Sequence, residues 1–158
     1  MKKAIIFDID GTLANNKHRV HWLECEKKDW NKFYSEMDKD APNEPIVFMC
    51  KAMLEHVYRS STTDDLRVFI FTGRPAQYEG KTREWLEKTL GWHCHVISGL
   101  IMRPEGDHRP DYQVKQEMLD KLKAEDYEIL FTVDDRKQVV DMWRSNGITC
   151  LQCDEGDF

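Results

Sequence analysis

The chain has 158 residues, 33% of them charged and 41% hydrophobic, which is typical of a globular domain with a full hydrophobic core. The formal net charge of −6 argues against a broad basic surface for nucleic acid, so any phosphate must be bound by a few placed cations. The first residues, MKKAIIFDID, are charged too soon for a signal peptide, and no apolar run is long enough to span a membrane. Five scattered cysteines favour reduced thiols over a disulfide framework, so we expect a cytoplasmic protein without a membrane partner.

Five short apolar segments predict β-strands. The first, second and fourth are apolar without a break, which favours strands covered on both faces, as in a parallel sheet. The segments are KAIIF (3–7), RVFIF (67–71), CHVIS (94–98), EILFTV (128–133) and ITCLQ (148–152).

Four amphipathic segments between these strands predict helices. Pro45 stands near the first turn of the first segment, Asp111 opens the third as its expected cap, and Gly91 and Gly147 end the second and the fourth. The segments are residues 46–58, 81–91, 111–125 and 136–147. Strands that alternate with helices predict β-α-β units wound right-handedly into a three-layer α/β domain over residues 1–158, with a parallel sheet of about five strands.

The segment of about residues 15–44 interrupts this alternation. It is rich in tryptophan and charge, and we expect it to form one or two short helices in a small cap-like insert after the first strand. Trp22, Trp30 and Phe33 either pack this insert onto the domain or, where one is exposed, offer a ring for stacking with a terminal base.

Three of the predicted strands end in polar residues. The first runs into FDIDGT, the second into FTGR and the fourth into TVDDR. In an open α/β sheet, ligands bind beyond the carboxyl ends of the strands, so we expect these clusters to meet in one crevice. The sequence therefore predicts a shared functional site.

Four aspartates belong to the predicted crevice: Asp8 and Asp10 follow the first strand, and Asp134 and Asp135 follow the fourth. Carboxylates at close range raise one another's pKa, so a counter-charge is required. A hard divalent cation with oxygen ligands, such as Mg²⁺, meets that requirement. For Asp135 the alternative is a helix cap, which does not exclude metal binding.

Further residues fit a phosphate ligand. Gly11 leaves room for backbone N–H groups to approach an anion, and Thr12 and Thr72 add hydroxyl donors. Lys115 lies one turn inside a predicted helix, on or beside the face turned to the sheet, where a lysine needs an anionic partner. The alternative is a surface lysine whose stem packs while its ammonium stays in water.

The motifs DIDGT, FTGR, a lone lysine in a helix and VDDR resemble, in this order, the four motifs of the haloacid dehalogenase (HAD) superfamily of phosphatases. The resemblance spans residues 4–136. The C-terminal stretch VDDRKQVVDMWRSNGITCLQCDEGDF is similar to the end of the 3′-phosphatase domain of phage polynucleotide kinase/phosphatase. Arg19 and the stretch RPEGDHRPDYQVK, in which Asp111 stands one helical turn before Lys115, are similar to that domain as well.

The resemblance implies a role for each matching residue. Asp8 would be the nucleophile that forms an aspartyl-phosphate, and Asp10 would be the general acid and base. Lys115 would hold phosphate oxygens beside them, oriented by Asp111. The residues implied in binding substrate or phosphate are Gly11, Thr12, Arg19, Thr72, Gly73 and Arg74. Mg²⁺ would be held by Asp8, the Asp10 carbonyl, Asp134 and Asp135.

The expected function is a Mg²⁺-dependent phosphomonoester hydrolase, specifically a polynucleotide 3′-phosphatase that heals 3′-phosphorylated DNA or RNA ends in the cytosol of a bacterium or a phage host. The short insert predicts an open cleft that admits a strand end. Alternatives are a phosphatase of nucleotides or sugar phosphates, a phosphoacceptor module, and an accessory subunit docked on a kinase or ligase. Asp10 argues against the phosphoacceptor, because a general acid and base speeds turnover. The choice between DNA and RNA, a homo-oligomer, and a separate kinase or ligase partner stay open.

Two other motifs are rejected. PAQYEGKT differs from a nucleotide-binding P-loop because Pro75 stands in place of the first glycine and the stretch follows FTGR. CLQC, at Cys150 to Cys153, and HCH at 93–95 lie in predicted strands, whereas four zinc ligands need a tight loop.

Overall fold

The structure is a computed structural model that describes residues 2–24, 26–60 and 65–156. Its main sheet has five parallel strands in the order β5-β4-β1-β6-β7. The strands are β1 (Lys2–Phe7), β4 (Leu66–Pro75), β5 (Gly99–Arg103), β6 (Tyr127–Arg136) and β7 (Cys150–Gly156). The expected α/β fold with a central parallel sheet of five strands is confirmed.

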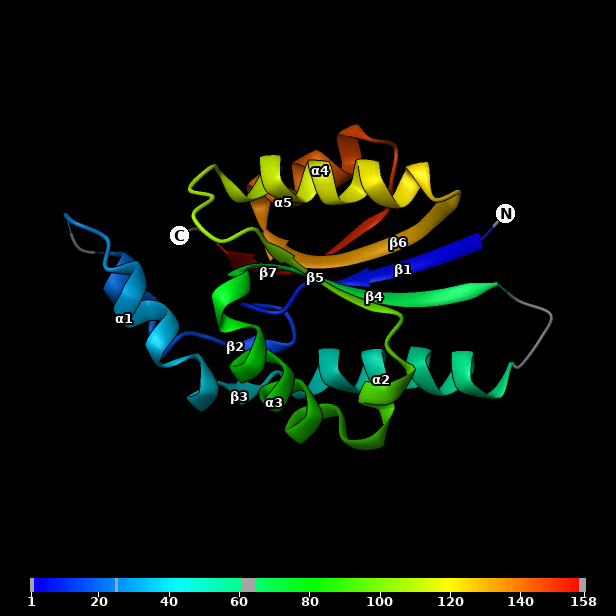
Figure 1. The fold of residues 1–158 in the computed structure, drawn as a ribbon, viewed down its shortest axis with the longest axis horizontal. Coiled ribbons are helices and arrows are strands. Elements are labelled where there is room, and N and C mark those ends of the chain that lie inside the picture. The colour runs from blue at the N-terminus through cyan, green and yellow to red at the C-terminus, as the bar shows by residue number, and fades with distance from the viewer. Residues whose placement is uncertain (1, 25, 61–64, 157–158) are drawn as a thin grey trace.

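Strand β1 lies in the middle of the sheet, between β4 and β6 (Figure 1). Ala4 and Ile6 belong to the core on one face of the sheet, and Ile5 and Phe7 to the core on the other. All four side chains are buried, which explains why this segment is apolar without a break. Phe7, the last residue of β1, pairs with Ile70 of β4 and Val133 of β6, and these two strands continue past it to Pro75 and Arg136.

Helices cover both faces of the sheet. Helices α4 (Asp111–Ala124) and α5 (Lys137–Ser145) lie on one face, and α2 (Glu44–Arg59) and α3 (Glu79–Leu90), which the short η3 (Ala76–Tyr78) precedes, lie on the other (Figure 1). Each pair closes its own hydrophobic core, so the sheet becomes the middle of three layers. Among the residues described, no helix has both the length and the apolar run needed to cross a bilayer.

The expected strand at residues 94–98 is wrong. Residues Gly91–Val96 form the 3-10 helix η4, and the edge strand β5 begins only at Gly99. Gly91 has a φ of 60°, a left-handed conformation that ends α3 and leads the chain into η4. A short apolar run does not by itself distinguish a strand from a helical turn, and the prediction failed for that reason.

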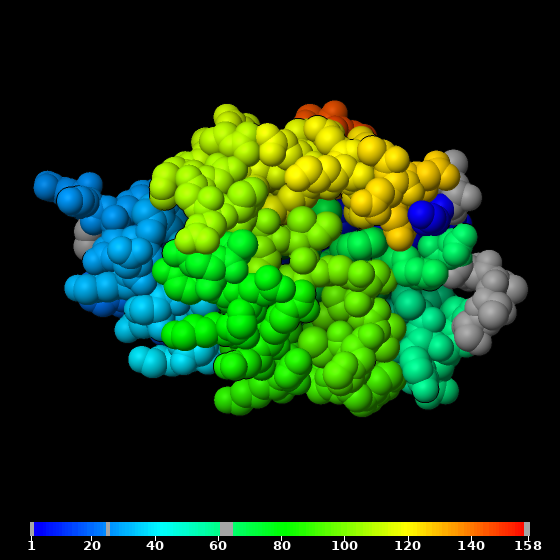
Figure 2. All heavy atoms as spheres, in the orientation of Figure 1, coloured from blue at the N-terminus to red at the C-terminus, as the bar shows by residue number. Residues whose placement is uncertain are grey.

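The residues between β1 and α2 form a small layer of their own, called here the insert (residues 14–42). Its first and last residues form the antiparallel pair β2 (Ala14–Asn15) and β3 (Ala41–Pro42), with η1 (Val20–Leu23), α1 (Trp30–Ser35) and η2 (Met37–Lys39) between them. The insert has its own core of Leu23, Phe33, Tyr34 and Met37. It lies at the end of the sheet where β1, β4 and β6 finish (Figure 1), and Figure 2 shows it in blue against the green segments that follow β4.

Candidate active site

The three central strands bring their polar residues to one place. Asp8 follows β1 directly, and its backbone N–H donates to the carbonyl of Val133 in β6 at 3.0 Å, which aligns the two strand ends. A cavity of about 40 Å³ lies beyond them. It is lined by Asp8, Asp10, Gly73, Asp111, Asp134 and Asp135, by Arg103 and Arg136, and by Trp30, Phe33 and Tyr34 of the insert.

Lys115 reaches this cluster from α4 and is only 1% exposed. Its Nζ donates to Asp8 Oδ1 at 2.8 Å and to Asp134 Oδ2 at 2.9 Å, and it lies 3.4 Å from Asp111 Oδ2. Burial alone would lower the pKa of Lys115, but these three carboxylates raise it well above its usual value, so the ammonium is charged. The alternative of a surface lysine does not hold.

Asp8, Asp134 and Asp135 form a cluster of buried carboxylates whose ligand oxygens all lie within 4.8 Å of one another. Burial raises the pKa of Asp8 well above its usual value although Lys115 opposes it, and burial together with Asp134 raises the pKa of Asp135 to about 7. Lys115 supplies one positive charge against three carboxylates. An excess of negative charge among oxygen donors is the environment that Mg²⁺ stabilises, so these residues fit a magnesium ion.

Asp135 lies between two glycines. A Cβ on Gly11 or on Gly156 would lie 2.1 Å from Asp135 Oδ2, so only glycine leaves room for this carboxylate. Gly11 also has a φ of 83°, which glycine adopts without strain. Thr12 Oγ1 donates to Asp135 Oδ1 at 3.4 Å. Gly11 and Thr12 therefore contact a candidate metal ligand, and neither lines the cavity.

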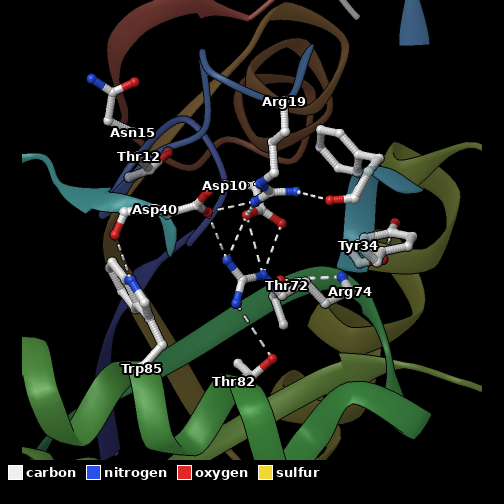
Figure 3. A network of polar contacts seen from close by, with 12 residues as sticks. Asp10, Thr12, Asn15, Arg19, Tyr34, Asp40, Thr72, Arg74, Thr82 and Trp85 are labelled. Carbon is white, nitrogen blue, oxygen red and sulfur yellow. Dashed lines mark hydrogen bonds and ion pairs between the residues drawn. The ribbon is translucent and has the colours of Figure 1, made fainter. Parts of the chain in front are cut away.

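Asp10 is held by two buried arginines from different parts of the chain (Figure 3). Arg19 Nη2 donates to Asp10 Oδ1 at 2.5 Å, while Arg74 donates through Nη2 to Oδ1 at 2.7 Å and through Nε to Oδ2 at 3.0 Å. Burial alone would raise the pKa of Asp10, but Arg74 and Arg19 together hold it well below its usual range. Asp10 is therefore ionised in this arrangement. Its side chain binds the two arginines and does not belong to the acidic cluster of Asp8, Asp134 and Asp135 found among the described residues.

Asp40, at the end of η2, holds the same two arginines from the other side (Figure 3). Arg19 donates to it through Nε at 2.7 Å and Nη2 at 2.5 Å, and Arg74 through Nη2 at 3.2 Å. Both arginines are fully buried, so they reach Asp10 and Asp40 and do not line the cavity. The sequence prediction did not include Asp40. The only indication of Asp40 is indirect: two buried arginines around one aspartate require a second carboxylate.

Thr72 and Gly73 lie near the end of β4. Thr72 is buried, and its Oγ1 accepts from the backbone N–H two residues further on at 3.2 Å. Gly73 lines the cavity, and its carbonyl accepts from Arg103 Nε at 2.9 Å and from the Tyr34 hydroxyl at 3.3 Å. A Cβ on Gly73 would lie 2.4 Å from Asp111 Oδ1, so glycine makes room for that carboxylate.

Asp111 opens α4 but does not cap it. Pro110 holds the N-cap position, and no side-chain cap bond forms there. The Asp111 carboxylate turns to the site instead, where it accepts from Arg103 Nη2 at 3.2 Å and lies near Lys115. Arg103 also donates to two backbone carbonyls of the loop before α4, so it ties the rim of the cavity together. No local pattern in the sequence distinguished Arg103 from other arginines.

Comparison with known proteins places this geometry in a family. The model of the polynucleotide kinase PNKP phosphatase domain matches residues 2–158. A protein of Autographa californica nuclear polyhedrosis virus, "Putative bifunctional polynucleotide kinase/RNA ligase", is 27% identical over 142 residues, which are 90% of this chain and 18% of that protein.

Solved structures of other proteins are similar to this chain as well. A chain in the structure of the Pnkp1/Rnl/Hen1 complex is 30% identical with a TM-score of 0.74, over 100% of this chain and 48% of that chain. The class C acid phosphatase from Bacillus anthracis, solved with tungstate bound, shares the fold at 14% identity with a TM-score of 0.62, over 100% of this chain and 69% of that chain.

This chain spans less than half the length of the viral relative and of the matched chains in the Pnkp1/Rnl/Hen1 structures. The family match itself covers nearly all of this chain, and it agrees with the parallel sheet and with the aspartates at the ends of β1 and β6. The chain belongs to the family of PNKP phosphatase domains within the HAD superfamily.

Proposed function

We propose that this chain is a Mg²⁺-dependent polynucleotide 3′-phosphatase that acts through an aspartyl-phosphate on Asp8 and serves the healing of RNA ends. One observation carries the proposal. Asp8 and its buried acidic partners line a small cavity, and Asp10, two residues further on, is held at the same cavity by Arg19 and Arg74.

The chemistry takes two steps. An Asp8 carboxylate oxygen attacks phosphorus, so that a P–O bond to Asp8 forms while the bond to the substrate's 3′ oxygen breaks, and Asp10 gives that leaving oxygen a proton. Water then attacks the aspartyl-phosphate, Asp10 takes the proton from that water, and inorganic phosphate leaves as Asp8 becomes a carboxylate again. Lys115, 2.8 Å from Asp8, offsets the negative charge that would otherwise repel an anionic substrate.

The contacts of Asp10 bear on both steps. Its hydrogen bonds from Arg19 and Arg74 favour the carboxylate, which is the form that accepts a proton from water in the second step. To donate a proton in the first step, Asp10 must be protonated, and a protonated carboxyl gives up at least one of those charged contacts. We therefore assign the arginines to positioning Asp10 and setting its proton affinity.

The acidic cluster is arranged for a metal ion. Mg²⁺ held by Asp8, the Asp10 carbonyl, Asp134 and Asp135 would neutralise charge on the phosphate and orient it for attack. Asp134 is oriented by Lys115 and by the Trp143 indole N–H, which donates to Asp134 Oδ2 at 3.4 Å. These contacts order the carboxylates before any ligand binds, which lowers the cost of reorganisation.

The small size of the cavity and the names of the related proteins support a polynucleotide end as substrate. The cavity of about 40 Å³ has room for a group of a few heavy atoms, so the rest of a substrate lies outside it. The viral relative is named for polynucleotide kinase and RNA ligase activities, and one structural relative belongs to the Pnkp1/Rnl/Hen1 RNA repair complex. On the basis of these names we propose that this chain acts on RNA ends in the cytoplasm and works with kinase and ligase partners.

The test measures phosphate release with Mg²⁺ from a 3′-phosphorylated RNA oligonucleotide, beside its DNA counterpart, its 5′-phosphorylated twin and 3′- and 5′-mononucleotides. The Asp8→Asn variant serves as the control for contaminating activity. We expect strong preference for the 3′-phosphorylated oligonucleotides, lost in Asp8→Asn and in EDTA. Equal or better hydrolysis of mononucleotides would retain the chemistry and assign the enzyme to small phosphomonoesters instead.

A further inference from the structure

Trp30 is the exposed part of the wall around the catalytic cavity. It lines that cavity together with Asp8 and Asp10, yet it is 39% exposed, whereas its neighbours Phe33 and Tyr34 are 2% and 9% exposed. Its indole N–H has no hydrogen-bond partner within the described ranges, unlike that of Trp22, which donates to Glu36 at 3.2 Å. Packing therefore accounts for Phe33 and Tyr34 but leaves much of the Trp30 ring facing solvent.

The ring of Trp30 is held in a defined orientation. Tyr34 stacks on it with ring centroids 5.9 Å apart and an interplanar angle of 25°, and Phe33 meets it edge-on at 5.8 Å and 86°. The Nζ of the exposed Lys28 lies 5.8 Å from the Trp30 ring centroid. A ring that is fixed by neighbours, half exposed and accompanied by a cation has the properties of a stacking platform for a nucleic-acid strand.

The platform is also fixed relative to the catalytic residues. The backbone carbonyl of Phe33 accepts from Arg19 Nη1 at 3.2 Å, and the Arg19 guanidinium lies 4.1 Å from the Phe33 ring centroid. The Tyr34 hydroxyl donates to the Gly73 carbonyl at the rim of the cavity. Helix α1 is thus connected to the group that holds Asp10 and to the end of β4, so a base on Trp30 and a phosphate at Asp8 would be held in one geometry.

We propose that Trp30 stacks on the terminal base of a 3′-phosphorylated strand and makes this site select nucleotides over other phosphate esters. The inference rests on the proposed function, since it presupposes a polynucleotide substrate. The terminal 3′-phosphate enters the cavity beside Asp8, the base of the same nucleotide lies on the exposed part of the indole, and Lys28 lies where the strand's next phosphates can be met. Because every base has a π face, this contact favours a base without choosing among the four.

The experiment compares two 3′-phosphorylated RNA oligonucleotides that differ only in the terminal nucleotide, which either carries its base or is an abasic ribose analogue. The quantity measured is the ratio of kcat/KM for the two substrates. The variants are Trp30→Ala, the aromatic substitution Trp30→Phe, and Trp92→Ala as the matched control. Trp92 is 49% exposed on η4 and does not line the cavity.

We expect the wild-type enzyme to prefer the substrate with a base by about 10-fold, the preference that one stacked base confers. Trp30→Ala should bring the ratio close to one, Trp30→Phe should restore most of it, and Trp92→Ala should keep the wild-type ratio. An unchanged ratio in Trp30→Ala, or no preference in the wild-type enzyme, would overturn the inference while the proposed function stands. Hydrolysis of small phosphate esters without hydrolysis of any 3′-phosphorylated oligonucleotide would overturn the proposed function first.

A binding measurement covers the case in which Trp30→Ala lowers the yield of folded protein. In the Asp8→Asn background, which binds without turnover, a 3′-phosphorylated trinucleotide should quench indole fluorescence, and the quench should fall sharply in Asp8→Asn/Trp30→Phe. The same quench in both proteins would place the stacking on another tryptophan and contradict the assignment.

Discussion

Asp10 and Asp40 share the same two arginines. Arg19 Nη2 lies 2.5 Å from a carboxylate oxygen of each aspartate, and Arg74 Nη2 lies 2.7 Å from Asp10 and 3.2 Å from Asp40. Burial raises the pKa of Asp40, whereas Arg74 and Arg19 lower that of Asp10 despite its burial. Asp40 comes from the insert and Asp10 from the end of β1, so this network couples the position of the insert to the residue assigned to proton transfer.

Asp40→Asn is expected to lower both stability and turnover. The substitution keeps the shape of the side chain but leaves two buried guanidinium groups with one carboxylate, and breaking a buried ion pair in this way costs about 3–5 kcal/mol. Because the arginines also position Asp10, kcat should fall by about 10- to 100-fold, with a smaller change in KM. Urea unfolding and steady-state kinetics measure the two effects. The exposed Asp38, two residues earlier in η2, provides the control Asp38→Asn, and equal behaviour of the two variants would contradict this role.

Lys115→Met is expected to abolish most phosphatase activity. Without the ammonium, Asp8 and Asp134 lose the cation that lies within 3 Å of both, and an anionic phosphate meets a more negative cluster of Asp8, Asp134 and Asp135. A loss of about 10²- to 10³-fold in kcat is the size that removal of one such electrostatic contact produces. Lys121→Met, an exposed lysine of the same helix, is the matched control. If Lys115→Met retained more than a third of wild-type kcat, the lysine would have a structural role only.

Gly156→Ala is expected to weaken Mg²⁺ binding. The new methyl group would lie 2.1 Å from Asp135 Oδ2 and 3.3 Å from the Arg136 Cα, so the carboxylate must leave its present position. The Mg²⁺ concentration for half-maximal activity should rise by about 10-fold, the lower end of the loss when groups around a metal ligand are disturbed. Gly80→Ala, in α3, meets nothing within 4 Å and should behave like the wild-type protein. An unchanged Mg²⁺ requirement in Gly156→Ala would argue against Asp135 as a ligand.

The stability gained from Mg²⁺ should be greater at about pH 8 than at about pH 6. The pKa of Asp135 is about 7 in the folded, metal-free protein, well above the usual value for an aspartate in an unfolded chain. At a pH between the pKa of Asp135 in the unfolded chain and its pKa in the folded protein, the folded protein binds more protons than the unfolded chain. The contribution of Asp135 to the free energy of unfolding is therefore full at low pH and falls by roughly 1 kcal/mol per pH unit as the pH rises toward 7. Mg²⁺ binds the ionised carboxylate and removes this penalty. Thermal unfolding with Mg²⁺ and with EDTA at both pH values measures the effect, and equal shifts in Tm would refute it.

Much of the fold could be predicted from sequence because its signals are local. Unbroken apolar runs marked β1 and β4, which are buried on both faces, and β6, whose C-terminal residues 132–135 are buried. Pro45, Gly91 and Gly147 marked helix ends. The prediction failed at residues 94–98, because a short apolar run does not distinguish a strand from a helical turn, and residues up to Val96 form η4 while β5 begins only at Gly99. Local pattern is informative for the long apolar runs of the central strands, and less so for a short run that suits more than one element.

The site, too, has residues that local sequence signals predicted and residues that they did not. Asp8 and Asp10 come just after β1, and Asp134 and Asp135 are among the last residues of β6, so their order along the chain already placed them at the carboxyl ends of neighbouring strands. Lys115 and Asp8 are 107 positions apart, and only packing of α4 on the sheet brings Nζ to 2.8 Å from Oδ1. Asp40 and Trp30 belong to the insert, whose sequence has no pattern that specifies how it docks.

By itself, the sequence determined a parallel α/β sheet with an acidic strand-end site, because hydrophobic period and strand-end polarity are properties of neighbouring residues. Tertiary structure alone decided that Arg19 and Arg74 hold Asp10 and Asp40, that Gly11 and Gly156 make room for Asp135, and that Trp30 keeps an exposed ring beside the cavity. Contacts between distant segments depend on side-chain packing to within an ångström, and the periodicity of a sequence does not carry that information.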